Sequence, residues 1–574
     1  MKDLIRVLSK LKLFKKELIT TILLVVVETF FELIIPFLMK DIIDKGISEG
    51  NMNQIYISGS LIIACAIISL ITGHFYAQSN ARLVTNFSYK LREDAYKKIQ
   101  EFSFSNLDQF HTTSLVTRVT NDITIIQNTL AGGLRPICRS PLMLIMGIGL
   151  SFAMAPKIAW IFVVFVPVLA LILFLIVRKT APQYHYLQKN VDFLNNIVRE
   201  NVTAIRTVKS YVREDYEEAK FNEANTKVMK TIKHTFRIAQ LNQPAFQFVM
   251  YTITVLFLGL GSKLVFNNEL KVGSLSALLS YIMQVINSLM MISNTFLLMN
   301  RSFASCKRLC EIFDVVIDIK SCENPIMEIK HGNIDFNDVY FKYKAGTGDY
   351  VLSDINLHIK AGESIGILGG TGSSKSTLVS LILRLYDTTK GSVCIDGIDV
   401  KKYDLTVLRD SISIVLQNNV LFSGTIRDNL KWGNPDATDE MILNACHIAC
   451  VDEFLDRIGG LDYDLGQGGV NVSGGQKQRL CIARALLKNP KIIIFDDSTS
   501  ACDMQTERKI MSGIRSLENV TSIVIGQRIS SVMDANRIII LDEGKIVSIG
   551  NHDELLKTSS IYKELYDAQI GGKE

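Results

Sequence analysis

Hydrophobic residues gather in the first half of the chain, in long apolar runs separated by polar connections. A bilayer core about 30 Å thick needs roughly 20 helical residues to cross it. The apolar runs predict membrane-spanning helices at residues 18–39, 55–77, 136–155, 158–177, 243–265 and 274–299. The fourth, IAWIFVVFVPVLALILFLIV, contains no charged residue.

Two long connections, 82–135 and 178–242, mix apolar and charged residues at helical spacing. This pattern is typical of amphipathic helices, so we expect the membrane helices to continue well beyond the bilayer. Both connections and the N-terminal run are rich in Lys and Arg, which marks the cytoplasmic side of a membrane protein. We therefore expect the membrane to be crossed several times, with both termini in the cytoplasm.

The second half has short β-like runs and glycine-rich turns, as in a soluble α/β domain. The alternating run GNIDFNDVYFKY opens it, and the strand-like run GESIGIL leads into GGTGSSKST and an apolar helix. The predicted fold is an N-terminal all-α domain of six spanning helices joined to a C-terminal α/β domain with a helical subdomain. We place the membrane domain at 1–315, a linker at 316–330 and the α/β domain at 331–574.

Composition changes this picture little. The 574 residues carry a net charge of +5, and much of the basic excess lies beside apolar segments, which favours lipid headgroups over nucleic acid as its partner. The ten cysteines form no Cys-x-x-Cys pair. We interpret them as reduced, partly buried thiols of a cytosol-facing protein.

The run GGTGSSKST has the strand, loop and helix context of a phosphate-binding P-loop. Backbone N–H groups of such a loop hold phosphate, Lys375 reaches the terminal phosphates and Ser376 can ligate Mg²⁺. Ser374 stands where this motif has its second glycine, and the sequence does not decide whether the position needs a positive φ. The predicted ATP-binding residues of the loop are Gly369, Gly370, Thr371, Gly372, Ser373, Ser374, Lys375, Ser376 and Thr377.

Further motifs follow in a fixed order: Gln417 in VLQNNVLFSGTIRDNL, the run VSGGQKQR, the buried strand KIIIFDD and Asp503. With the P-loop and six preceding spans, this set resembles the ABC transporter family, in the membrane-domain-first order of ABC exporters. The resemblance covers essentially the whole chain. It implies a half-transporter that binds ATP and Mg²⁺ and pairs with a second half.

The resemblance also implies a role for each matching residue. Tyr343 would stack on adenine, Asp496 would hold Mg²⁺ with Ser376 and Gln417, and Gln417 would link the metal site to the membrane helices. Asp503 would lie in the loop after the carboxylate strand, the D-loop of the family. The signature, Ser473, Gly474, Gly475 and Gln476, would cap the nucleotide held by the P-loop of the partner.

Two positions depart from the family pattern. The catalytic carboxylate is usually a Glu after the magnesium Asp, and here that residue is Asp497, which is one methylene shorter. A misplacement of about 1 Å can cost about 100-fold in rate. The switch residue is usually His, and here it is Gln527, which exchanges hydrogen bonds without becoming charged.

Together these departures resemble the degenerate-site subunit of heterodimeric bacterial multidrug ABC exporters. The implied function is ATP-driven efflux of drugs or other amphipathic compounds across the cell membrane of a bacterium. Its own ATP site would be slow or inactive, and its signature would complete the active site of the partner. Two alternatives stay open: a lipid or peptide exporter, possibly homodimeric, and a non-transporting protein that uses nucleotide as a switch.

Glu28 and Glu32 lie one turn apart inside the first predicted span, where each charge costs about 2.5–3.5 kcal/mol on insertion scales. They need an aqueous cavity or a partner. One interpretation is a substrate pathway for cationic or amphipathic cargo. The other is a structural contact with neighbouring helices, for example with Arg139.

Overall fold

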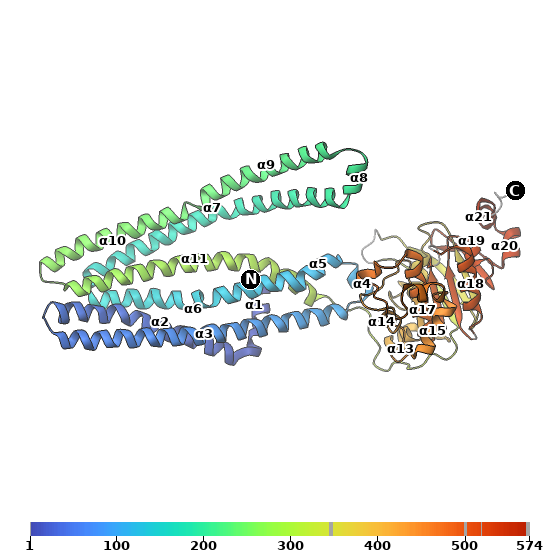
Figure 1. Ribbon diagram of the computed structural model, residues 1–574, viewed down its shortest axis with the longest axis horizontal. Helices are drawn as coiled ribbons and strands as arrows, with labels where there is room; N and C mark the ends of the chain where they lie inside the picture. The colour runs from blue at the N-terminus through green and yellow to red at the C-terminus, as the bar shows by residue number, and fades with distance from the viewer. Residues whose placement is uncertain (1, 344–347, 499–501, 518, 570–574) are drawn as a thin grey trace. The chain divides into compact units, whose positions relative to one another are not determined.

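The computed structural model in Figure 1 describes residues 2–343, 348–498, 502–517 and 519–569. The chain folds into two units. The first extends to Asp314 but leaves out residues 100–112, which belong to the second unit together with the chain after Asp314. Each unit is described below by itself.

The first unit is helical, and six of its described helices are long and apolar enough to cross a membrane. α3, with 49 residues, and α7, with 48, are each far longer than one bilayer crossing requires. The expected extension of the spanning helices is thus confirmed. The helices are α1 (Lys2–Ser9), α2 (Lys15–Asp41), α3 (Met52–Gln100), α5 (Thr112–Thr117), α6 (Ile123–Met154), α7 (Pro156–Thr203), α8 (Ile205–Ser210), α9 (Glu214–Ala239), α10 (Asn242–Phe266) and α11 (Val272–Asp314).

Within this unit α11 packs along α6 and α2, and α9 lies beside α7 (Figure 1). The α6 and α11 backbones come close at Gly147, where an added Cβ would lie 3.0 Å from a methyl of Val285. Tyr281 of α11 is fully buried and its hydroxyl donates to the carbonyl of Leu33 in α2, over 2.8 Å. α2, α6 and α11 therefore form one packed group.

The second unit contains two sheets. One has the order β2-β1-β4-β5, and the other has the order β10-β9-β3-β8-β7-β6, in which β9, β3, β8, β7 and β6 are parallel neighbours. The strands are β1 (Ile334–Phe341), β2 (Leu352–Ile359), β3 (Ser364–Leu368), β4 (Lys390–Ile395), β5 (Ile398–Asp399), β6 (Ile412–Val415), β7 (Ile492–Asp496), β8 (Thr521–Ile525), β9 (Arg537–Asp542) and β10 (Lys545–Gly550).

Helices cover the parallel sheet and form the helical subdomain. They are α12 (Lys375–Ile382), α13 (Leu405–Asp410), α14 (Ile426–Leu430), α15 (Asp439–Ile448), α16 (Asp452–Ile458), α17 (Gly474–Leu487), α18 (Met504–Arg515), α19 (Ile529–Val532), α20 (His552–Thr558) and α21 (Ser560–Gln569). The carboxyl ends of parallel strands meet at one edge of the sheet, and there β3 leads into the P-loop and β7 ends at Asp496.

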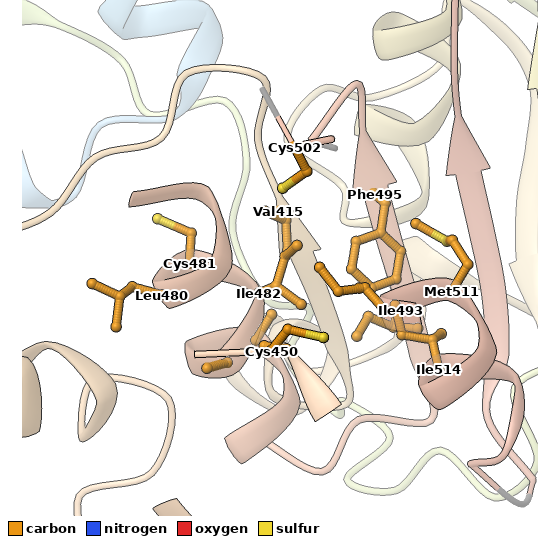
Figure 2. Close-up of a cluster of buried hydrophobic side chains, with 14 of the residues drawn as sticks. Val415, Cys450, Leu480, Cys481, Ile482, Ile493, Phe495, Cys502, Met511 and Ile514 are labelled. Atoms are coloured by element: carbon orange, nitrogen blue, oxygen red, sulfur yellow. The ribbon is translucent and has the colours of Figure 1, made fainter. Parts of the chain in front are cut away.

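One hydrophobic core joins α17 to β7 and α18, and Figure 2 shows part of it. Ile482 of α17 and Ile493 of β7 are both fully buried, and Phe495 is 1% exposed. Cys450, Cys481 and Cys502 are buried in the same core, and all ten cysteines are free thiols. Because these elements share a core, the start of α17 and the end of β7 are held in a fixed relation.

The segment 100–112 differs from expectation. We expected it to continue a membrane-domain helix, but α3 ends at Gln100 and the short helix α4 (Phe104–Leu107) begins after a new N-cap. The Ser103 side chain accepts from the N–H of Asn106 in a capping box. The Asn106 side chain donates to the carbonyl of Val316 over 3.2 Å, which ties the segment to the second unit.

Candidate functional site

The P-loop connects β3 to α12, and Lys375 is the first residue of that helix. Its Nζ donates to the carbonyls of Gly369 and Gly370, each over 2.8 Å. Burial lowers the pKa of Lys375, although the carboxylates of Asp497 and Asp496 act in the opposite direction. The ammonium group is thus held across the loop, where a phosphate anion can replace the two carbonyls as its partner.

The backbone of the loop shows whether position 374 needs a positive φ. This residue precedes α12 with φ 72° and ψ 22°, in the left-handed region. A non-glycine residue there costs about 1–2 kcal/mol, and the Ser374 side chain makes no capping hydrogen bond that would offset this cost. The position therefore needs a positive φ, and serine strains the loop.

Gly369 is required for a different reason. A Cβ at this position would lie 2.1 Å from the carbonyl oxygen of Leu541 in β9 and 2.6 Å from Ser373 Oγ. These contacts are too short for any real side chain. The glycine lets the loop approach the end of the neighbouring strand.

Asp496 and Ser376 meet at the end of β7. The Ser376 hydroxyl donates to Asp496 Oδ1 over 2.8 Å. Asp496 is 6% exposed, and burial raises the pKa of its carboxyl while the Ser376 hydrogen bond lowers it. A hydroxyl and a carboxylate are hard oxygen donors of the kind that Mg²⁺ prefers, so these residues fit the expected ion.

Asp497 adopts φ 47° directly after the strand. Gln527, which follows β8, donates from Nε2 to Asp497 Oδ2 over 2.9 Å, and Gln417 Nε2 lies 3.4 Å from the same oxygen. Two residues that the sequence singled out, Gln527 and Gln417, thus converge on one carboxylate oxygen of a third, Asp497. That oxygen already accepts a hydrogen bond from an amide.

The signature lies at the start of α17. Ser473 is the N-cap, with its side chain accepting from the N–H of Gln476 and the Gln476 side chain accepting from the N–H of Ser473. Gly474 is the first helical residue, and a Cβ there would meet nothing within 4 Å. The helix start is therefore well ordered and open, with backbone N–H donors available to an anion.

Tyr343, the expected adenine-stacking residue, is tied to the P-loop helix. Its hydroxyl lies 2.9 Å from Thr377 Oγ1, and its ring meets the ring of Tyr386 edge to face with centroids 5.2 Å apart. The Tyr386 hydroxyl donates to Asp108 Oδ2 over 2.9 Å. Tyr343 and Tyr386 also line a cavity of about 600 Å³. Sequence reasoning missed Tyr386, although it is an aromatic residue only four positions after α12.

Asp503 has a clear local role as the N-cap of α18. Its carboxylate accepts from the N–H groups of Gln505 and Thr506 and from the Thr506 hydroxyl. The backbone and side-chain hydrogen bonds of Thr506 hold the pKa of Asp503 below its usual value. The side chain fixes the start of α18.

In the membrane unit, Glu28 forms an ion pair with Arg135 and Glu32 forms one with Arg139, the latter at 2.5 Å. The expected contact of Glu32 with Arg139 is present. Arg135 was not singled out, although it lies four residues before Arg139 and so repeats the spacing of the two acids.

Family models match both units. Residues 18–289 match the model described as ABC transporter transmembrane region, and residues 352–500 match the one described as ABC transporter. The chain is 36% identical over 551 residues to an uncharacterized ABC transporter ATP-binding protein, YfiB, of Bacillus subtilis strain 168, covering 96% of each chain.

A second relative in Bacillus subtilis is a putative multidrug export ATP-binding/permease protein, YgaD, at 30% identity, covering 98% of this chain and 99% of the relative. Among solved structures, a bacterial Atm1-family ABC exporter with ATP bound superposes with a TM-score of 0.83. It is 23% identical and covers 98% of this chain and 99% of its own, which shows a shared fold.

Proposed function

The chain belongs to the ABC transporter family, as an exporter half-transporter that couples ATP hydrolysis to transport, and from this premise we propose a division of labour. ABC half-transporters work as dimers. In our proposal this chain pairs with a different half, holds ATP at a slow site of its own and supplies its signature to the fast site of the partner.

The observation that carries the proposal is the state of Asp497. A general base must lie within hydrogen-bond reach of the attacking water. Gln527 Nε2 donates to Asp497 Oδ2 at 2.9 Å and holds the carboxylate in place, and the Asp497 side chain is shorter than the usual Glu. Gln527 gives no ionisable group that could take over the proton. The site is therefore suited to binding ATP and poorly suited to activating water.

The strained Ser374 and the intact signature support the same proposal. Ser374 carries the strain in the loop that holds this chain's own nucleotide. Ser473 and Gln476 satisfy each other at the start of α17 and leave its first turn open. The departures thus affect the residues that serve the chain's own site and spare those that would serve the partner's site.

We propose that Ser376, Asp496 and Gln417 hold Mg²⁺ together with ATP. The ion supplies positive charge that neutralises the phosphate oxygens. Lys375 exchanges its contacts with Gly369 and Gly370 for the terminal phosphates, and Tyr343 presents its ring to adenine.

For the cargo we propose drugs or other amphipathic compounds, exported across the bacterial cell membrane with the ATP-binding unit in the cytoplasm. The support is the relative named as a putative multidrug exporter, at 30% identity. The basic connections agree with the cytoplasmic placement.

The test is ATP turnover by the purified chain alone and together with the half-exporter encoded beside it. We expect turnover only in the pair, and its loss when the catalytic Glu of the partner is changed to Gln. Robust turnover by this chain alone would refute the proposal and favour a homodimer.

A further inference from the structure

Two ion pairs join α2 to α6 in the membrane unit. Glu28 contacts Arg135 through Oε1 and Nη2, and Glu32 contacts Arg139 through Oε2 and Nη2. Both acids and both bases are spaced four residues apart, so the pairs are stacked one helical turn from each other. We call these four residues the ion-pair ladder.

In the first pair of the ladder, the acidic and the basic side chain are not equally exposed. The Glu28 side chain is 5% exposed, whereas that of its partner Arg135 is 37% exposed. Glu28 is also closed off by α3, because a Cβ at Gly73 would lie 3.1 Å from its Oε1. In this pair the carboxylate is enclosed between helices and the guanidinium forms the accessible side.

Further contacts hold Arg135 in this position. Its guanidinium carbon lies 5.5 Å from the ring centre of Tyr76, which is 6% exposed. A cation over an aromatic face is stabilised, so this contact favours the observed position of the guanidinium. In the second pair Arg139 and Glu32 are about equally exposed, at 24% and 25%.

Arg139 lies within the predicted span 136–155, and Arg135 pairs with Glu28, which lies within the predicted span 18–39. Charged groups at this depth face a bundle interior or a water-filled space, because exposure to hydrocarbon costs too much. Each ion pair uses one terminal nitrogen of its arginine. A guanidinium has five N–H donors in a planar fork that matches carboxylate and phosphate. The ladder therefore retains donors for an anion.

In the Glu28–Arg135 pair a cation has no equivalent place. The Glu28 carboxylate is buried and already neutralised, so a cationic group would have to displace Arg135 to reach it. An anionic group needs no such displacement. The enclosed Glu28 is therefore poorly placed to attract positively charged cargo, and the exposed charge of its pair is the guanidinium of Arg135.

We propose that the ion-pair ladder binds the anionic headgroup, carboxylate or phosphate, of an amphipathic compound. This inference rests on the proposed export of amphipathic compounds and names the chemistry of the group that is recognised. The same headgroup chemistry can come from a bilayer lipid or from a compound that enters the transporter, and the test separates these sources.

The experiment uses the full chain with its partner half in nanodiscs of phosphatidylcholine, without ATP. Binding is measured by fluorescence anisotropy with two matched probes, a fluorescent dodecanoate and the corresponding dodecylamine. ATP turnover is measured separately in the same preparations, so that a failure of the exporter proposal is seen independently of binding.

We expect the anionic probe to bind about tenfold more tightly than the amine, a difference of about 1.4 kcal/mol. Arg139→Gln should weaken binding of the anionic probe about tenfold. Glu32→Gln should strengthen it, because it frees the Arg139 fork. Lys157→Gln, which removes the same charge from an ion pair with Glu269 outside the ladder, should leave it unchanged.

The opposite signs of the two ladder variants separate binding from a structural role. A merely structural ladder would lose binding of both probes equally in Arg139→Gln and Glu32→Gln, and that result would overturn the proposal. Tighter binding of the amine to the unmodified complex would also overturn it. Competition by added phosphatidylglycerol would support the site and assign it to lipid, whereas its absence would support a compound other than bilayer lipid.

Discussion

The nucleotide-binding unit contains two regions that face ATP in ABC transporters. They differ in how closely their residues follow the motifs of the family. In the P-loop region, Ser374 sits in a left-handed conformation and Asp497 is already hydrogen-bonded to Gln527. In the signature region, Ser473 and Gln476 form a complete capping box. Within one domain, the P-loop region has thus departed from the family motif, whereas the signature region has kept it.

The two regions can change separately because they serve different ATP molecules in a dimer of this family. If the P-loop region and the signature region served the same ATP site, a change that inactivated the P-loop region would also remove the function of the signature region. An intact signature next to an altered carboxylate site is therefore informative. Four variants, one of them a double substitution, would test this comparison, and they are given from the largest expected effect to the smallest.

Gly474→Asp should reduce ATP turnover of the complex by about 100-fold or more, since in our proposal it puts a carboxylate against the phosphates of the partner's nucleotide. Folding should be unaffected, because there is open space for a Cβ at Gly474 and an acid is favourable in the first turn of a helix. Phosphate release and the melting temperature check both expectations. Ser560→Asp, which adds the same charge at the first residue of α21, is the control. Unchanged turnover in Gly474→Asp would contradict the role of the signature.

Asp497→Glu combined with Gln527→His should raise turnover of this chain's own site about tenfold, because it restores reach and an ionisable partner. The measurement uses a complex whose partner lacks its catalytic Glu, so that only this site contributes. Each single variant serves as a control for the other. No gain in the double variant would show that something other than these two side chains limits the site.

Ser374→Gly should raise the affinity for ATP a few-fold and increase stability by about 1 kcal/mol, because glycine adopts φ 72° without strain. Nucleotide titration and thermal unfolding of the full chain measure the two effects. Ser374→Ala removes the hydroxyl but keeps the strain, so it should not reproduce the gain. If alanine raised affinity as much as glycine, the hydroxyl and not the backbone would be responsible.

Asp497→Asn should change turnover of the intact complex by no more than about twofold, since in our proposal most turnover occurs at the site completed by the partner's catalytic Glu. Steady-state phosphate release is sufficient to measure it. A 100-fold loss would mean that Asp497 is the working base, and the contrast between the two regions would then have to be abandoned.

Sequence reasoning located the elements of the nucleotide-binding unit well, because each motif lies next to a strand or helix with a strong pattern. The strand ending at Asp496 is an unbroken apolar run, and the P-loop follows directly from a strand. The six spans could be predicted equally well, since length and hydrophobicity alone define them. The association of segment 100–112 with the second unit could not be predicted, because it depends on contacts such as that of Asn106 with Val316.

The order of motifs, the six spans and the departures at Ser374, Asp497 and Gln527 were determined by the sequence itself, because residue identity and spacing are local properties. Only the tertiary structure decided that Ser374 needs a positive φ, that Gln527 donates a hydrogen bond to Asp497 and that Glu28 forms an ion pair with Arg135. These facts depend on the backbone path and on groups 30 to 107 residues apart in the chain. No local pattern encodes such distances, since they arise when separate elements pack against one another.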